Sequence, residues 1–171
     1  MRLALIIAIT ISILAPHQRE APSVVGAQTF VSTFGKFSIA LPNATAFGPL
    51  TIPTPFGNAR GQLFQWETKE ATFGVGYADA FQPLEDPEIA KEFFKSATDR
   101  FNKVATANSG SVATVKQITL DKRPGIEQRV ELFTGSVIQR TYVVSRRIYE
   151  VVAVMKNSQK VYESVALGVL D

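Results

Sequence analysis

Three consecutive strand patterns near the C-terminal end constrain the fold of this chain more than any other feature. Their residues are largely β-branched or aromatic, and Gly135-Ser136 and Ser145-Arg146 leave space only for short turns between them. Strands joined by such turns pair antiparallel, because a parallel pair needs a long crossover connection. The last strand is apolar on both alternating faces, which predicts a central position in the sheet. The strands are expected over residues 125–133, 136–144 and 147–156.

Further strands and turns are expected upstream. Alternating apolar residues predict four strands, whereas the Pro- and Gly-rich residues 43–61 predict a loop or an edge segment. Arg123-Pro124-Gly125 predicts a turn. In the strand over 71–78, Gly74 and Gly76 share one face and leave room for a helix to pack close to the backbone. The four strands are expected over 34–42, 62–67, 71–78 and 111–121.

Two helices complete the expected order of elements. Asp86 is a favourable N-cap residue and Pro87 suits the first helical position, so we expect a helix from there to Asn108. A second helix is expected over 157–171. The apolar stripe of the first helix consists of Ala90, Phe93, Phe94, Ala97, Phe101 and Val104. The sequence therefore predicts one α+β domain, a mostly antiparallel sheet of about six to seven strands flanked by helices as an α/β/α sandwich.

The N-terminal segment is typical of a signal peptide. Arg2 supplies a positive charge, and the apolar run Leu3–Ala15 has 13 residues, too few to span a membrane as a helix. The small residues Val25-Gly26-Ala27 predict cleavage before Gln28. We expect export to the periplasm or the extracellular space, with an uncleaved membrane anchor as the alternative. The expected division is residues 1–27 as signal peptide, 28–33 as a lead-in and 34–171 as the domain.

The residue types on which many enzymes depend are scarce. The chain has no cysteine, and its one histidine, His17, lies in the expected signal peptide. Ser-His-Asp and Cys-His triads and zinc sites with these ligands are thereby excluded from the mature chain. The formal net charge of +3 is too small to indicate nucleic-acid binding by itself. We expect no enzyme activity, no cofactor and no metal.

The order of these elements resembles the PsbP-like fold, named for an extrinsic subunit of photosystem II and shared with a Ran-binding nuclear transport factor. The resemblance rests on four motifs in order, GKFSIALP, GVGYADA, RPGIEQ and YVVSRRIYEVVAV, which together span nearly all of residues 34–171. It implies an α/β/α sandwich that acts by binding a partner, without shared catalytic residues. It does not imply photosynthesis, because bacterial relatives of this kind are mostly exported proteins of unknown role. In domains of this family the last helix runs on through a Ser-Phe pair that this sequence lacks, so the resemblance implies a truncated last helix at Asp171.

Five arginines lie in or beside the three C-terminal strands, and two interpretations of them stay open. With the turns given above, Arg140 is expected opposite Glu131 on one face of the sheet. Arg129 is expected opposite Tyr142, and Tyr142 opposite Tyr149. One interpretation is a ladder of compensated charges, because cross-strand pairs of opposite charge contribute roughly 0.2–1 kcal/mol each. The alternative is a face that binds an anion or a partner, formed by Arg129, Arg140, Arg147, Tyr142 and Tyr149.

The remaining charged residues considered are not expected to form a binding site. Arg123 and Arg146 are expected in solvent at turns. The acidic residues Asp79, Glu85, Asp86 and Glu88 suit a capped helix start better than a calcium site, because they lack the spacing of a metal-binding loop.

The function that we predict is an exported, non-catalytic binding or assembly module, monomeric or weakly associating, with an unidentified protein partner and no nucleic acid. The alternative is a protein that binds a small amphipathic ligand through the Pro-rich loop and Trp66. Tyr77, Phe81 and residues 53–56 would line the groove for such a ligand.

Overall fold

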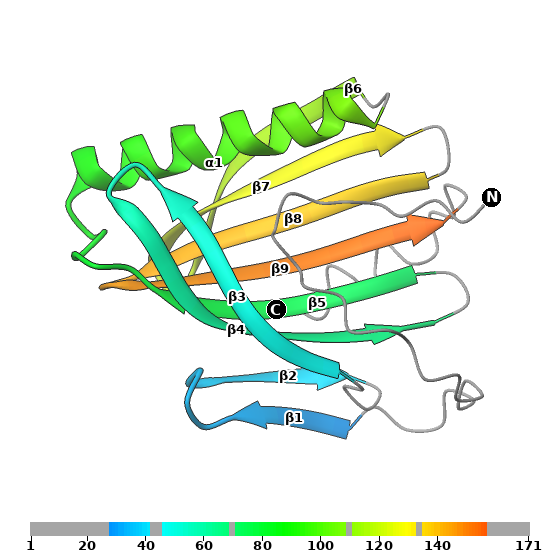
Figure 1. Cartoon of the computed structure of the whole chain (residues 1–171), viewed down its shortest axis with the longest axis horizontal. Helices are drawn as coiled ribbons and strands as arrows, with labels where there is room; N and C mark the ends of the chain where they lie inside the picture. Colours follow the sequence, from blue (N-terminus) through cyan, green and yellow to red (C-terminus); the bar gives the residue numbers. More distant parts are fainter. Residues whose placement is uncertain (1–27, 42–45, 69–70, 109–110, 133–134, 157–171) are drawn as a thin grey trace.

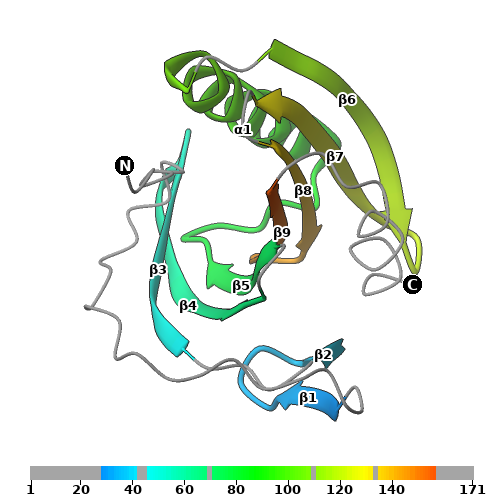
Figure 2. The same cartoon turned by 90° about the vertical axis from the view of Figure 1, so that its right-hand side faces the viewer.

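The chain forms a strongly curved antiparallel sheet with one long helix against its concave face (Figures 1 and 2). The computed structural model describes residues 28–41, 46–68, 71–108, 111–132 and 135–156. The elements are β1 (Gln28–Ser32), β2 (Phe37–Leu41), β3 (Ala46–Thr54), β4 (Gly57–Glu67), β5 (Ala71–Asp79), α1 (Pro87–Ala107), β6 (Ser111–Leu120), β7 (Arg123–Leu132), β8 (Gly135–Val144) and β9 (Arg147–Lys156).

The large sheet has the strand order β3-β4-β5-β9-β8-β7-β6, and every neighbouring pair is antiparallel. The predicted run of antiparallel C-terminal strands is confirmed, and β9 lies in the middle of the sheet as its two apolar faces indicated. The turn Ser145-Arg146 is also where it was predicted, with Val144 paired to Arg147 on either side of it.

Helix α1 begins and ends where the sequence predicts. The Asp86 carboxylate accepts hydrogen bonds from amides of the first turn, and Pro87 is the first helical residue. The apolar stripe of the helix packs on the concave face of the sheet, where Phe93 and Phe101 belong to two separate core clusters. Burial of one such side chain stabilises the fold by about 1.5–3 kcal/mol, so this stripe fixes the helix on the sheet.

Part of the convex face, on the side of β4 and β5, is covered by the two-stranded sheet of β1 and β2 (Figure 2). Phe30 of β1 and Phe37 of β2 pack against Phe64, with ring centroids 4.8 and 6.1 Å away. Residues 28–33, expected as a lead-in, therefore contain a strand. The second helix of the predicted sandwich falls at 157–171, outside the described residues. The described part of the fold is thus dominated by sheet, with a helix on one face.

The described part of the Pro- and Gly-rich segment, residues 46–61, holds strands rather than a loop. The predicted edge segment is confirmed for β3, which lies at the edge of the sheet and can therefore contain Pro49 and Pro53. β4 is an interior strand, however, and it starts within this segment at Gly57. Gly57 has a φ of 110°, which glycine adopts without strain, so β3 and β4 join through a tight turn.

Two predicted turns are wrong. Arg123 is already paired with Leu120 in the sheet, and the turn before it is Asp121-Lys122, with φ angles of 47° and 64°. Gly135 is paired with Leu132, so the connection between β7 and β8 lies before the predicted Gly135-Ser136. The register of β7 and β8 therefore differs from the predicted one by an even number of residues, which leaves each side chain on its predicted face.

The space beside Gly74 and Gly76 is occupied by leucines instead of the expected helix. A Cβ atom on Gly76 would lie 2.7 Å from Leu50 Cδ2, and one on Gly74 would lie 3.5 Å from Leu63 Cδ1. These two leucines share a core cluster with Phe93 of α1, so they form the layer between the sheet and the helix.

Candidate functional site

Each of the five arginines near the last strands has a partner within the chain. Arg140 lies opposite Glu127 instead of Glu131, and Tyr142 lies opposite Gly125 instead of Arg129, so these two predicted pairings are wrong. The shortest contacts are Arg123–Glu85 at 3.2 Å, Arg129–Glu131 at 2.8 Å, Arg140–Glu127 at 2.6 Å, Arg147–Asp79 at 2.7 Å and Arg146 Nε to the Ala80 carbonyl at 3.1 Å. Much of the charge in this region is thus compensated internally.

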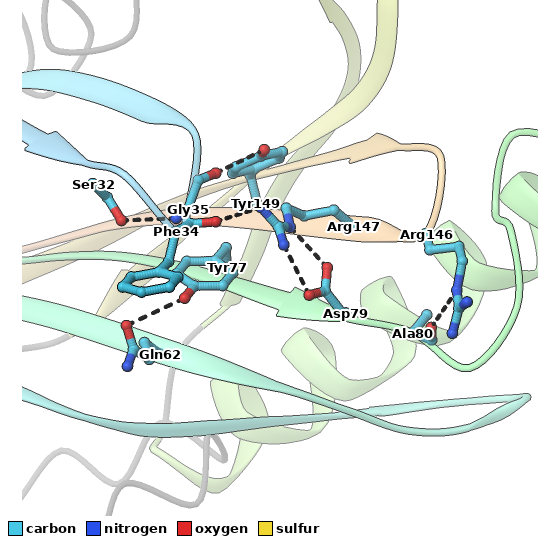
Figure 3. A network of polar contacts seen from close by, with 10 residues as sticks. All are labelled: Ser32, Phe34, Gly35, Gln62, Tyr77, Asp79, Ala80, Arg146, Arg147 and Tyr149. Atoms are coloured by element: carbon cyan, nitrogen blue, oxygen red, sulfur yellow. Dashed lines mark hydrogen bonds and ion pairs between the residues drawn. The ribbon is translucent and has the colours of Figure 1, made fainter.

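Arg147 ties three segments of the chain together (Figure 3). Its Nε and Nη2 donate to the two carboxylate oxygens of Asp79 at 2.7 and 2.8 Å, and its Nη1 donates to the Phe34 carbonyl at 2.7 Å. Its guanidinium carbon lies 4.8 Å from the centroid of the Tyr77 ring. A bidentate pair fixes the orientation of the guanidinium plane, so Arg147 holds the β1–β2 turn against β5 and β9.

Tyr149 fixes the same turn from a second direction. Its hydroxyl donates to the Gly35 carbonyl at 2.9 Å, and the Gly35 amide donates to Ser32 Oγ at 2.9 Å (Figure 3). The Phe34 and Gly35 carbonyls are therefore both held by side chains of β9. The backbone that carries Phe34 is fixed before any partner binds.

The charges around Asp79 favour its ionised form. The hydrogen bond from Arg147 lowers the pKa of Asp79, burial opposes this effect, and the positive charges of Arg147, Arg146 and Lys36 add to the lowering. The pKa of Arg147 is raised, chiefly by its hydrogen bond with Asp79. Three cations thus surround the Asp79 carboxylate.

The Arg147–Asp79 pair is expected to stabilise the fold as a coupled unit. In a double-mutant cycle of Arg147→Gln and Asp79→Asn, we expect a coupling free energy of about 1 kcal/mol, decreasing with salt because Asp79 is half exposed. Because the folded pKa of Asp79 lies below its ordinary 3.8, this contribution is present above that pH and is lost as the pH falls through the folded pKa. Urea unfolding of the four proteins measures the coupling.

The matched control for this cycle is the Lys91–Glu88 pair on the surface of α1, where both side chains are highly exposed. Its coupling is expected to be near zero. Equal coupling in the two cycles would show that Arg147 does no more than a surface ion pair.

Two phenylalanines are exposed beside this network. Phe34 is 80% exposed and Phe81 is 84% exposed. Phe81 follows Ala80, whose amide donates to the Arg146 carbonyl at 2.7 Å and whose carbonyl accepts from Arg146 Nε. Both phenylalanines therefore lie on backbone that is held by hydrogen bonds. Phe34, Lys36, Phe81 and Arg146, whose segments are joined through the Arg147–Asp79 pair and the Ala80–Arg146 hydrogen bonds, are together called the aromatic end.

The structure separates the predicted binding residues. Trp66 is only 3% exposed and stacks on Phe73, with ring centroids 5.2 Å apart and an angle of 5° between the planes. Pro53, expected in the same groove, lines a separate cavity beside α1. Arg147 and Tyr149 belong to the frame of the aromatic end, Arg129 and Arg140 lie in salt bridges along β7 and β8, and Tyr142 and Trp66 are buried.

The acidic residues near the start of α1 have structural roles. Asp86 caps the helix, and Glu85 accepts a hydrogen bond from the Ser145 amide at 2.8 Å. Within the described ranges, no group of three or more acidic or histidine side chains converges as a metal site.

Glu150 is absent from the predicted sites, yet it is the most strongly perturbed acid among the described residues. It is 4% exposed beneath α1, and Gln139 Nε2 donates to its Oε1 at 3.2 Å. Burial raises the pKa of Glu150 to about 7, against the opposing positive charge of Arg100. The sequence does contain a signal for this residue, because Glu150 is an acidic residue within a strand that is predicted to be buried on both faces.

The fold defines an α+β protein with a seven-stranded antiparallel sheet, a helix on the concave face and a two-stranded sheet on the convex face. The solution structure of cyanobacterial PsbP (CyanoP) from Synechocystis sp. PCC 6803 is similar, with a TM-score of 0.57 over 90% of this chain and 94% of that chain. At 8% sequence identity the similarity concerns the fold alone. This chain has a PsbP-like fold, as its motifs indicated.

No protein-family model and no curated protein matches the sequence. In the part of the chain that the structure describes, no helix is both long and apolar enough to cross a membrane.

Proposed function

We propose that this protein is an exported, non-catalytic binding or assembly module that holds a protein partner through the aromatic end. The observation that carries the proposal is the exposure of Phe34 and Phe81 on a hydrogen-bonded, positively charged frame. The PsbP-like fold supports a binding role by analogy only. The apolar N-terminal run and the small residues after it support export.

The exposed phenylalanines suit an interface better than a free surface. Aromatic side chains are enriched at protein interfaces and among the residues that dominate binding energy. Burial of each ring in a partner would contribute about 1.5–3 kcal/mol. Because the backbone at Phe34 and Ala80 is already fixed, binding orders few additional groups, and more of that free energy appears as affinity.

The charges indicate the chemistry of the partner. Lys36 and Arg146 are exposed, and neither forms a salt bridge with a described residue, whereas Asp79 is already bound by Arg147. A complementary surface would offer an apolar pocket with carboxylates at its rim. Such charges mainly accelerate association and orient the partner.

The double variant Phe34→Ser/Phe81→Ser is expected to lose the partner while it keeps its fold. Both side chains are mostly in solvent, so the free energy of unfolding should change by less than about 0.5 kcal/mol. Loss of the two rings that the partner would bury should weaken binding by at least about tenfold. Quantitative affinity capture from native extract, compared with the wild type, measures this loss.

The matched control is Val115→Ser/Leu120→Ser, which removes two other exposed apolar side chains, on β6. Its partner recovery should equal that of the wild type. Equal recovery with both double variants, or no partner specific to the wild type, would contradict the proposed surface.

The alternative function, binding of a small amphipathic ligand, is favoured by a different observation. A cavity beside α1 is lined in part by the Pro-rich segment, at Thr51, Ile52 and Pro53, but Trp66 does not contribute to it. This cavity is separate from the aromatic end.

A further inference from the structure

A small cavity lies between the C-terminal half of α1, the edge strand β3 and the concave face of the sheet. Its volume is about 50 Å³, and it opens to solvent. Most of the wall is apolar, with Phe101 and Val104 from the helix and Val130 and Val137 from the sheet. A space of this size admits a few water molecules or the end of a small ligand.

Two ionisable side chains line this apolar wall, Glu150 from β9 and Arg100 from α1. Glu150 is 4% exposed and Gln139 is 8% exposed. Arg100 Nη1 donates to Ser96 Oγ at 3.2 Å, and burial lowers the pKa of Arg100 while the charge of Glu150 raises it. The charges of Arg100 and Glu150 shift each other's pKa, but no salt bridge joins the two side chains among the described residues.

The polar surroundings of Glu150 are incompletely satisfied within the described chain. Gln139 Nε2 is its hydrogen-bond donor, and the same nitrogen lies 3.4 Å from Thr141 Oγ1. Gln128 lies opposite Gln139 in the register of β7 and β8, is fully buried, and neither amide atom has a partner among the described residues. Unpaired buried polar groups cost about 1–3 kcal/mol each, so this cluster is not explained by stability.

We propose that this cavity binds the carboxylate end of a small apolar monocarboxylic acid, with Arg100 and Glu150 as its polar contacts. Arg100 supplies the positive charge and a fork of donors that matches a carboxylate. Protonated Glu150 donates its O–H to the other side of the same group. The alkyl part then lies against Phe101, Val104 and Val137 towards the mouth of the cavity.

The two other amphipathic ligand classes fit less well. An alkylammonium would face the like charge of Arg100 in a largely apolar space. An alcohol would leave the guanidinium uncompensated. The charge of the cavity therefore selects an acid, and the small volume selects a slender alkyl chain.

The proton on Glu150 makes binding dependent on pH. The elements packed around Glu150 present Arg100 from α1, Gln139 and Thr141 from β8, and Gly76 from β5, of which only Arg100 is charged. Because the carboxylate binds next to protonated Glu150, affinity should fall by up to about tenfold per pH unit above the folded pKa of about 7.

The test titrates the full chain with hexanoate, hexylamine and hexan-1-ol by calorimetry, at about pH 6 and about pH 8. Hexanoate is expected to bind saturably, at least about tenfold more tightly than the other two, and more tightly at the lower pH. Binding of the amine or the alcohol with equal or higher affinity, or no saturable binding of hexanoate, would overturn the proposal.

Variants assign the contacts. Arg100→Gln should weaken hexanoate binding by about tenfold or more, whereas Lys103→Gln, which removes an exposed charge from the same helix, should not. Glu150→Gln keeps a donor and should bind equally at both pH values. Unchanged binding in Arg100→Gln, or an unchanged pH profile in Glu150→Gln, would refute the assignment. Circular dichroism of each variant distinguishes lost binding from lost folding. Arg100→Lys keeps the positive charge and serves as the conservative variant.

Discussion

Glu150→Gln should stabilise the protein by about 3 kcal/mol at pH 8 and change its stability little near pH 4. The folded pKa of Glu150 is about 7 against an ordinary value of 4.5, because burial disfavours the charged carboxylate. The folded state therefore favours the neutral acid. The free energy of unfolding declines as the pH rises from the pKa of Glu150 in the unfolded chain to its pKa in the folded protein. The neutral amide of the variant removes this decline.

The measurement is the free energy of unfolding in urea, at pH intervals between about 4 and 9, for the wild type and Glu150→Gln. Glu127→Gln serves as the control. It also replaces a glutamate of the sheet, but Glu127 is paired with Arg140 at 2.6 Å, so its loss should destabilise at neutral pH. If the free energy of unfolding depended on pH in the same way for the wild type and Glu150→Gln, the pKa of Glu150 would not be raised by burial.

Gly61→Ala should destabilise the protein by about 3 kcal/mol, because a Cβ atom at this position would overlap the Tyr77 carbonyl oxygen. The same Cβ would lie 2.6 Å from Ala78 Cα. These obstacles are backbone atoms of β5, so no side-chain rotation relieves the contact. The pairing of β4 with β5, in which Gly61 lies opposite Ala78, would have to shift.

Gly48→Ala is the matched control in the neighbouring strand β3. A Cβ on Gly48 meets no atom within 4 Å, so the change should stay within about 0.5 kcal/mol. Thermal or urea unfolding compares both variants. Similar stability for the two would contradict the close approach of β4 and β5.

The central part of the fold was predictable because its signals are local. The turn between β8 and β9 and the cap of α1 depend on neighbouring residues, and both predictions are confirmed. The turn before β7 was not predictable in this way. Asp121 and Lys122 both adopt positive φ angles without a glycine, whereas the adjacent Pro124 and Gly125 carry the stronger turn signal but lie within the strand.

The candidate sites were less predictable because they depend on contacts between distant segments. Arg147 meets Asp79 across the β5–β9 pair, and its other partner, Phe34, comes from the β1–β2 turn. No local pattern encodes this meeting. Glu150 did carry a signal, an acid within an apolar strand, but the identity of its neighbour Arg100 depends on how α1 crosses the sheet.

The central claim is that the aromatic end holds a protein partner, and site-specific photo-crosslinking in native cells tests it most directly. A photoreactive phenylalanine analogue would replace Phe34 or Phe81 in turn, with the exposed positions Val115 and Lys103 as controls. The account predicts one adduct, of the same partner, from positions 34 and 81 and none from the controls. Adducts from the control positions alone, or none from 34 and 81, would contradict it.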